Sequence, residues 1–129
     1  MPGRPRTHLS TECEAFCEFS IAASRRLTGV AADHPCARLH GHTFVVRVTV
    51  SGPIDPRTGF VADFADIQAA WAPVRTALDH RNLNLVGGLE NPTSENIARW
   101  IWRALTGNLP SLDSVQVRET GHSGVEYRG

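Results

Sequence analysis

Cysteine is scarce in this 129-residue chain, and neither sign of charge is in excess. Its three cysteines, Cys13, Cys17 and Cys36, lack the spacing of a disulfide framework, which predicts reduced thiols and a cytoplasmic protein. Thirteen Lys and Arg residues balance thirteen Asp and Glu residues, so no basic surface for nucleic acid is expected. The sequence also has no apolar run of membrane-spanning length and no apolar signal sequence after Met1, so we expect no membrane partner.

The distribution of apolar and turn-forming residues predicts one domain with strands at both ends and helices between them. We expect residues 1–15 to be a loosely ordered arm and residues 16–129 to be the domain. β-branched and aromatic residues predict strands at 16–24, 43–51, 114–119 and 124–128. The order of two strands, two helices and two strands favours an α+β fold with an antiparallel sheet over a doubly wound parallel sheet.

Apolar residues at helical spacing predict the two helices. Asp63 is a suitable N-cap for the first helix, and Pro73 inside it is expected to kink it or loosen its middle. Thr93 or Ser94 can cap the second helix. The apolar positions are Phe64, Ile67, Trp71, Val74 and Leu78 in the first helix, and Ile97, Ile101 and Leu105 in the second.

The segment Cys-Ala-Arg-Leu-His-Gly-His at residues 36–42 lies at the mouth of the second predicted strand. Because side chains alternate along a strand, His40 and His42 are expected on one face, and Gly41 leaves the other face open to close approach. Two imidazoles on one face suit zinc or a similar ion. Cys36 is then a third ligand, or a nucleophile or base beside the metal. The alternative is a pair of polar residues that closes a turn.

Asp79, His80 and Glu119 are further candidates for chemistry. Asp79 can fix the tautomer of His80 and raise its basicity, a pairing suited to proton transfer. The alternative is a histidine stabilised by the dipole at the C-terminal end of a helix. Glu119 ends an apolar strand, where it is either the acceptor for N–H groups of a flat, amidine-like heterocycle or a solvated strand end.

Several segments have the order and spacing of motifs from one family. They are Cys36-x-x-x-His40-Gly41-His42, Asp55-x-x-Thr58-Gly59-x-x-x-Asp63-Phe64, Leu78-Asp79-His80-x-x-Leu83-Asn84, Asn91-Pro92-Thr93-Ser94-Glu95-Asn96, and Arg118-Glu119-Thr120 followed by Tyr127-Arg128-Gly129. From about Phe19 to Gly129, the chain resembles the 6-pyruvoyltetrahydropterin synthase superfamily, and within it the 6-carboxytetrahydropterin synthases of the queuosine pathway. The resemblance implies the tunnelling fold, a four-stranded antiparallel sheet with two helices on one face.

The resemblance also implies an activity and an assembly. The implied activity is that of a lyase that converts 7,8-dihydroneopterin triphosphate to 6-carboxy-5,6,7,8-tetrahydropterin and releases acetaldehyde and triphosphate. Subunits of the family join their sheets edge to edge into a barrel, with active sites at the subunit interfaces. We therefore expect a homo-oligomer, a hexamer in preference to a tetramer, and the balanced charge of the chain is compatible with assembly.

The same resemblance implies roles for single residues. Cys36 matches the thiol that abstracts a proton from the substrate side chain, and Asp79 and His80 match a catalytic pair. Glu119 matches the carboxylate that anchors the pterin ring, and Thr93 belongs to a substrate-binding motif. One alternative is a pterin-binding homologue with altered or lost activity. Another is a metal-independent reaction on a related pterin.

His40 and His42 match two zinc ligands of the family, whose zinc acts as a Lewis acid on the substrate side chain. The third ligand is a histidine, but Arg25 stands at its position, and arginine has no lone pair to give to zinc. Three other histidines can replace it only if the fold brings one close: His34, His122 and His8. Otherwise His40 and His42 bind metal weakly, or the Arg25 guanidinium occupies the cation's place and contacts a substrate oxygen.

Overall fold

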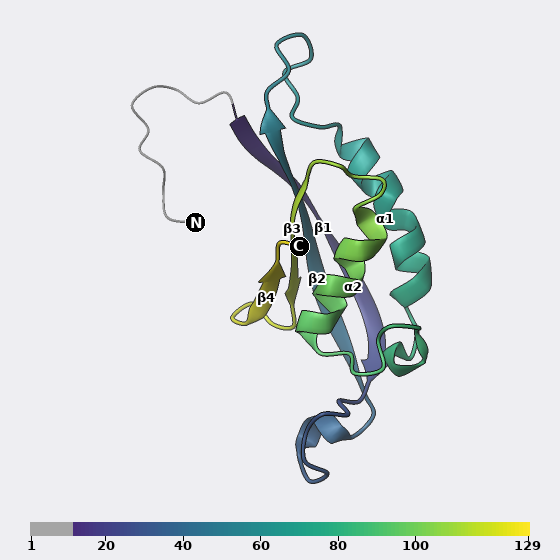
Figure 1. The fold of residues 1–129 in the computed structure, drawn as a ribbon. Helices are drawn as coiled ribbons and strands as arrows, with labels where there is room; N and C mark the ends of the chain where they lie inside the picture. The colour runs from purple at the N-terminus through teal and green to yellow at the C-terminus, as the bar shows by residue number, and fades with distance from the viewer. Residues whose placement is uncertain (1–11) are drawn as a thin grey trace.

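The computed structural model describes residues 12–129, which form four strands and two α-helices (Figure 1). In chain order these are β1 (Glu12–Arg25), β2 (His40–Pro53), α1 (Phe64–Leu78), α2 (Ser94–Leu105), β3 (Leu112–Arg118) and β4 (Gly124–Tyr127). The strands form one antiparallel sheet in the order β1-β2-β3-β4, and both helices cover the same face of it. The predicted α+β fold is therefore confirmed.

β1 begins earlier than the sequence predicted. The expected boundary between arm and domain after residue 15 lies too late, because residues 12–15 pair with residues 50–53 of β2. The sequence around Glu12 is polar and predicted an arm. Ala15, however, continues the alternation of side chains along β1 and packs against the core. Residues 1–11 of the predicted arm lie outside the described residues.

β2 is also longer than predicted, and it carries both candidate imidazoles. It begins at His40, so His40 and His42 belong to the strand itself. Cys36 lies in the preceding loop, on a short 3-10 helix (Pro35–Ala37). In Figure 1 this loop extends beyond the end of the sheet. The candidate residues therefore gather at one end of the sheet.

One hydrophobic core fills the space between the sheet and the helices. The sheet contributes Ile21, Ala23, Phe44, Val46, Val48, Val50, Val115 and Val117, and the helices contribute Ile67, Trp71, Val74, Leu78, Ile97, Ile101 and Leu105. Of the predicted apolar helix positions, Phe64 is the exception, because it lies exposed in the first turn of α1. Fully burying a large apolar side chain contributes about 1.5–3 kcal/mol, so this contact between layers stabilises the fold.

Side-chain caps fix where the two helices begin. Asp63 accepts a hydrogen bond from the backbone N–H of Ala65 at 2.9 Å and caps α1, as predicted. Thr93 accepts one from the backbone N–H of Asn96 at 3.1 Å and caps α2. α1 continues through Pro73, which is exposed, so the carbonyl left without an N–H partner faces solvent.

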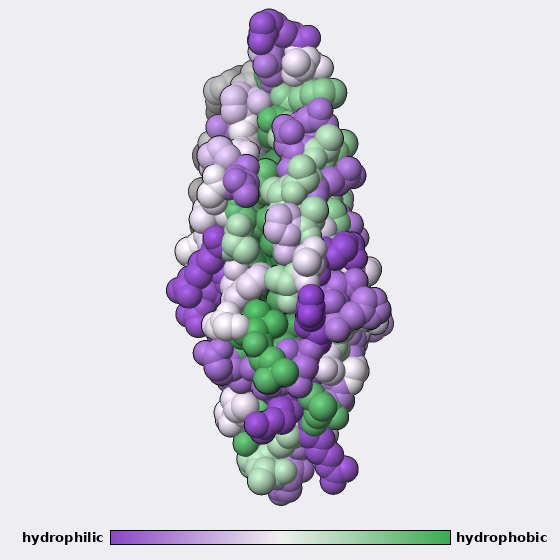
Figure 2. All heavy atoms as spheres, turned by 90° about the vertical axis from the view of Figure 1, so that its right-hand side faces the viewer, coloured by the Kyte–Doolittle hydropathy of each residue, from purple (hydrophilic) through white to green (hydrophobic). Residues whose placement is uncertain are grey.

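The surface on the α1 side mixes hydrophilic and hydrophobic side chains over a narrow, elongated outline (Figure 2). Large apolar side chains that remain exposed come from several elements: Phe16, Leu39, Ile54, Phe60, Phe64 and Leu85. Within residues 12–129, neither α1 with 15 residues nor α2 with 12 is long and apolar enough to cross a membrane.

Candidate functional site

The paired ends of β1 and β2 bring Arg25 and the two histidines onto one face of the sheet. Arg25 lies directly opposite His40 in the antiparallel register, and His42 lies opposite Ala23. Because paired residues point to the same side and side chains alternate, Arg25, His40 and His42 all point to the face that the helices cover. The structure thus places Arg25 beside the two imidazoles, at the position where the resemblance implies a third histidine ligand.

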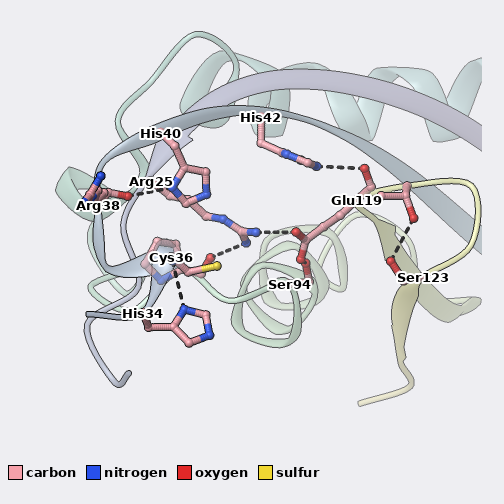
Figure 3. Close-up of polar contacts among 11 residues, drawn as sticks. Arg25, His34, Cys36, Arg38, His40, His42, Ser94, Glu119 and Ser123 are labelled. Atoms are coloured by element: carbon pink, nitrogen blue, oxygen red, sulfur yellow. Dashed lines mark hydrogen bonds and ion pairs between the residues drawn. The ribbon is translucent and has the colours of Figure 1, made fainter. Parts of the chain in front are cut away.

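Arg25 is buried at the centre of this group (Figure 3). Its side chain is only 3% exposed, and its guanidinium lies 4.8 Å from the centre of the Phe44 ring. One terminal nitrogen donates to the backbone oxygen of Pro92 at 2.9 Å, and the other lies 2.6 Å from Oε1 of Glu119. The Nε–H is buried and has no hydrogen-bond partner among the described residues. A buried guanidinium needs a counter-ion, and Glu119 supplies it.

Glu119 follows the end of β3, and its side chain is held at the start of α2. Oε1 contacts Arg25, and Oε2 accepts a hydrogen bond from the hydroxyl of Ser94, the first residue of α2. Burial works against ionisation of Glu119, but the Ser94 hydrogen bond and the charge of Arg25 outweigh it, so the pKa of Glu119 is lowered. The side chain is still 33% exposed. It is therefore a fixed, ionised carboxylate with lone pairs open to a ligand.

The two imidazoles are each held by a backbone carbonyl. Nε2 of His42 lies 2.9 Å from the backbone oxygen of Glu119, and Nδ1 of His40 lies 2.7 Å from that of Arg38. A carbonyl oxygen only accepts, so both of these ring nitrogens carry a proton. The other nitrogen of each ring is the one that could ligate a metal ion.

Two ring nitrogens alone do not make a complete metal site. A catalytic zinc takes three protein ligands and leaves a position for water or substrate. Among residues 12–129, no three His, Cys, Asp or Glu side chains are grouped so that they could hold a metal ion. The predicted zinc site therefore does not fit the residues present, because the third position holds Arg25 and a guanidinium cannot ligate a metal.

The histidines that could substitute for the third ligand have other places or roles where the structure describes them. Nδ1 of His34 accepts a hydrogen bond from the backbone N–H of Cys36 at 3.0 Å and caps the 3-10 helix. His122 is exposed in the turn between β3 and β4, and His8 lies outside the described residues. Within residues 12–129, neither His34 nor His122 therefore completes the metal site, and the position stays without a third ligand.

Cys36 is part of the same end of the molecule as Arg25 and His40. The backbone oxygen of Cys36 accepts from the N–H of Leu27 at 2.7 Å, which fixes its loop to the segment after β1. The residue is half-buried, and in Figure 3 its thiol points towards the side of the site where Arg25 and Glu119 lie. No hydrogen bond joins the thiol to another described residue, so it is available to a ligand.

Asp79 and His80 lie at the C-terminal end of α1, against the outer edge of β1. Oδ1 of Asp79 accepts from the backbone N–H of Ala22 at 2.9 Å, and the His80 N–H donates to the Ala22 carbonyl at 2.6 Å. This N–H donation from Ala22 is the main cause of the lowered pKa of Asp79. Oδ2 of Asp79 is 3.6 Å from Nε2 of His80, close enough for attraction but long for a hydrogen bond.

His80 is strained and open to solvent. Its φ of 58° lies in the left-handed region, which is unusual for a residue other than glycine. Its side chain is 83% exposed. The following residues continue along β1, where the Ser24 N–H donates to the Arg81 carbonyl at 3.0 Å and Ser24 forms a parallel bridge with Asn82. The turn therefore presents the His80 imidazole at the sheet edge.

A surface hollow of about 620 Å³ extends from part of this edge to the His42 imidazole. Its lining residues are Ala22, Ala23, Ser24, Gly41, His42, Thr43, His80, Arg81 and Asn82. His42 and His80 therefore share one hollow, whereas Cys36, Arg25 and Glu119 do not line it. No hydrogen bond or ion pair within residues 12–129 joins Asp79 or His80 to Cys36: the first two are held against Ala22 of β1, and Cys36 lies on the 3-10 helix.

Two contacts of the site were not singled out from the sequence. Ser94 binds the Glu119 carboxylate, and Pro92 accepts from Arg25 through its backbone oxygen. Both belong to the segment 91–96, whose capping pattern marked the start of a helix but not the direction of its hydroxyl groups. Thr93, predicted to bind substrate, uses its side-chain oxygen to cap α2.

Comparison with known proteins gives consistent matches. Residues 14–129 match the family described as 6-pyruvoyl tetrahydropterin synthase. The 6-carboxy-5,6,7,8-tetrahydropterin synthase of Synechocystis sp. is 42% identical over 118 residues, which is 87% of this chain and 90% of that protein. The dihydroneopterin monophosphate aldolase of Pyrococcus furiosus is 43% identical over 91 residues, which is 68% of this chain and 76% of that protein.

A solved structure agrees with these sequence matches. The 6-pyruvoyl tetrahydropterin synthase of Caenorhabditis elegans superposes with a TM-score of 0.84 at 28% identity. The match covers 92% of this chain and 96% of the C. elegans chain. The likeness therefore extends over most of both chains.

Proposed function

Because the chain belongs to the 6-pyruvoyl tetrahydropterin synthase family, we propose that it converts 7,8-dihydroneopterin triphosphate to 6-carboxy-5,6,7,8-tetrahydropterin, with release of acetaldehyde and triphosphate. The observation that carries this proposal is the 42% identity to a 6-carboxy-5,6,7,8-tetrahydropterin synthase across most of both chains. The relatives are named as enzymes, so a pterin-binding protein without activity is the less favoured alternative.

The Glu119 carboxylate is the proposed anchor for the pterin ring. It is ionised, held by Arg25 and Ser94, and one third exposed, so it can accept two N–H groups from an amidine-like edge. A carboxylate fixed in this way orients the ring before reaction, because little side-chain entropy remains to be lost on binding.

Cys36 and the Asp79–His80 pair are the proposed proton carriers. Cys36 takes a proton from the side chain of the bound pterin, and the pair gives or accepts the second proton. The Asp79 carboxylate lies 3.6 Å from Nε2 of His80, where it can orient the ring for proton transfer. Zinc has no step in this scheme, because the residues present do not form its site.

The proposed enzyme acts as a homo-oligomer, with a hexamer favoured. Within residues 12–129, no hydrogen bond or ion pair joins Cys36 to His80, and a neighbouring copy placed against the β1 edge would add its own groups to the site. We further propose a place in queuosine biosynthesis, which the resemblance of the motifs implies, and a cytoplasmic location, which the spacing of the three cysteines favours.

The test is turnover on a panel of dihydropterins, including the triphosphate, the monophosphate and unphosphorylated 7,8-dihydroneopterin. The panel includes the monophosphate because one relative is named for that substrate. We expect 6-carboxytetrahydropterin from the triphosphate. Cys36→Ala should remove turnover and leave pterin affinity nearly intact.

The matched controls are Cys13→Ala and Cys17→Ala, which should keep turnover within a few fold. Cys13 is exposed far along β1 from Cys36, and burial raises the pKa of Cys17, which makes it a poor thiolate. Full activity of Cys36→Ala would show that the thiol is not the base. Binding of several pterins without turnover of any would favour the pterin-binding alternative.

A further inference from the structure

The strongest unassigned feature is the buried cation at the third position of an incomplete metal site. Arg25 lies opposite His40 at the ends of β1 and β2, on the same face as both imidazoles. It is 3% exposed and makes three separate contacts, with Glu119, with the Pro92 carbonyl and with the face of Phe44. These contacts hold the buried side chain in one position, so Arg25 is an integral part of the site.

The charge of Arg25 works against a metal ion at the same place. A guanidinium stays protonated at every pH that a protein survives, and burial weakens the screening of its charge by water. A divalent ion bound between His40 and His42 would lie beside this positive charge, and the Glu119 carboxylate that could offset a cation here is already paired with Arg25. Among the described residues, no third His, Cys, Asp or Glu joins them.

Arg25 also does something that a ligand histidine could not do. Its terminal nitrogen is 2.6 Å from Oε1 of Glu119, so it fixes one oxygen of the carboxylate while Ser94 holds the other. The Glu119 backbone oxygen meanwhile accepts from Nε2 of His42. Arg25 therefore acts on the ligand through Glu119, which makes it a positioning residue.

We propose that Arg25 replaces the metal ion of this site. In this protein the positive charge belongs to the chain, His40 and His42 bind no divalent metal of functional strength, and Arg25 holds Glu119 in place for its ligand. The part that concerns the pterin rests on the proposed function. The part that concerns metal does not.

The first experiment measures zinc on the full chain, purified without a histidine tag. A competition titration against a chromogenic chelator should find no stoichiometric zinc in the unaltered protein, and treatment with a chelator should not change its turnover. Arg25→His should bind one zinc per chain, at least about tenfold more tightly than the unaltered protein. The double variant Arg25→His/His42→Ala should lose that gain.

Two results of this experiment would overturn the proposal. One is a stoichiometric zinc in the unaltered protein that survives prolonged chelation. The other is a folded Arg25→His variant that gains no zinc affinity. The measurement on the unaltered protein decides the metal question even if Arg25→His does not fold.

The second experiment tests positioning through binding of 7,8-dihydroneopterin, followed by fluorescence. Arg25→Met removes the charge and keeps much of the volume, and it should weaken binding by about tenfold or more. Arg25→Lys keeps a cation for Glu119 but has neither the second nitrogen for Pro92 nor the planar group over Phe44, so its affinity should fall between those of Arg25→Met and the unaltered protein. Equal affinity of Arg25→Met and the unaltered protein would overturn the positioning role.

If the unaltered protein binds no dihydropterin at all, the proposed function fails. The zinc titration still tests the replacement of the metal, so the two failures can be told apart.

Discussion

The Glu119 carboxylate has two roles. It is the counter-ion of the buried Arg25, and in the proposed function it is also the acceptor for the pterin ring. The two roles are compatible because a carboxylate has about four lone-pair directions, and Arg25 and Ser94 use one on each oxygen. The exposed third of the side chain is the part left for the ring.

Glu119→Gln should therefore weaken pterin binding by about tenfold or more. The amide turns one acceptor into a donor, which loses a charge-assisted hydrogen bond of about 1.5–3 kcal/mol. Fluorescence titration with a dihydropterin measures the loss. Because the pKa of Glu119 is lowered, the affinity of the unaltered protein should stay constant down to acidic pH and fall only when the carboxylate takes up a proton.

The control for Glu119→Gln must restore charge balance, since this change leaves Arg25 buried without a counter-ion. Breaking a buried pair costs about 3 kcal/mol or more, and less here because Glu119 is partly exposed. The double variant Glu119→Gln/Arg25→Met should regain much of the stability but none of the affinity. An unchanged dissociation constant in the folded single variant would mean that the ring is held elsewhere.

The pairing of Arg25 with Glu119 marks the limit of prediction at this scale. Alternation along β2 correctly placed His40 and His42 on one face, and the motif spacing correctly drew attention to Arg25. The ion pair joins residues 94 positions apart in the chain, and no local pattern encodes such a distance. Ser94 was missed for a similar reason, because a capping pattern does not show what an adjacent hydroxyl faces.

Among the elements, α2 supports the site through its N-terminal turn. Thr93 closes that turn by accepting from the Asn96 N–H, and Ser94 directly after it binds the Glu119 carboxylate. The N-terminal end of a helix favours negative charge, so the turn and the carboxylate stabilise each other. An open turn would release both the cap and the Ser94 contact.

Thr93→Ala should lower the free energy of unfolding by about 1 kcal/mol, since it removes the N-cap acceptor. Chemical denaturation measures the loss, and Thr93→Ser should recover most of it. Thr76→Ala is the matched control, because the Thr76 hydroxyl bonds back to the Ala72 carbonyl inside α1 and caps nothing. Equal stability of Thr93→Ala and the unaltered protein would mean that another group caps α2.

The boundaries of the elements followed from the sequence where a local signal marks them. Asp63 and Thr93 are such signals, and both helices begin beside them. The start of β1 was placed too late, because residues 12–15 become a strand only through pairing with β2. The run of His80, Arg81 and Asn82 along β1 was also not foreseen, since it depends on the position of the end of α1.

At the scale of the whole molecule, the candidate catalytic groups lie on two sides of β1. Cys36 and Arg25 point to the helix-covered side of the sheet end, and Asp79 and His80 are attached to the outer edge of the strand. Within the described residues, β1 has a continuous sheet partner on its β2 side only. Assembly of copies along this edge would bring the groups of one copy near those of another.

A complementation experiment tests whether the site is shared. Cys36→Ala and His80→Ala chains should each be inactive as pure assemblies. After unfolding and refolding as an equal mixture, about a quarter of the activity should return, because that fraction of shared sites combines two intact halves. Light scattering of the same samples reports the size of the assembly.

The control for this mixture is each variant refolded alone, which should stay inactive. A mixture that also stays inactive, although mixed assemblies form, would place Cys36 and His80 of one chain in the same site. A protein that remains a monomer at every concentration would contradict the proposed assembly.

The replacement of a metal ion by Arg25 also changes how the protein depends on the supply of zinc in the cell. Occupancy of a metal site follows the free concentration of the ion, so a metalloenzyme loses active molecules when the ion is scarce. The Arg25 guanidinium is covalently part of every chain that is synthesised, so it cannot be lost or replaced by a competing ion. Replacing zinc by arginine has a chemical cost, because an arginine cannot lower the pKa of a bound hydroxyl as zinc does. A chain built in this way gives up some acidity at its site and gains independence from the zinc status of the cell.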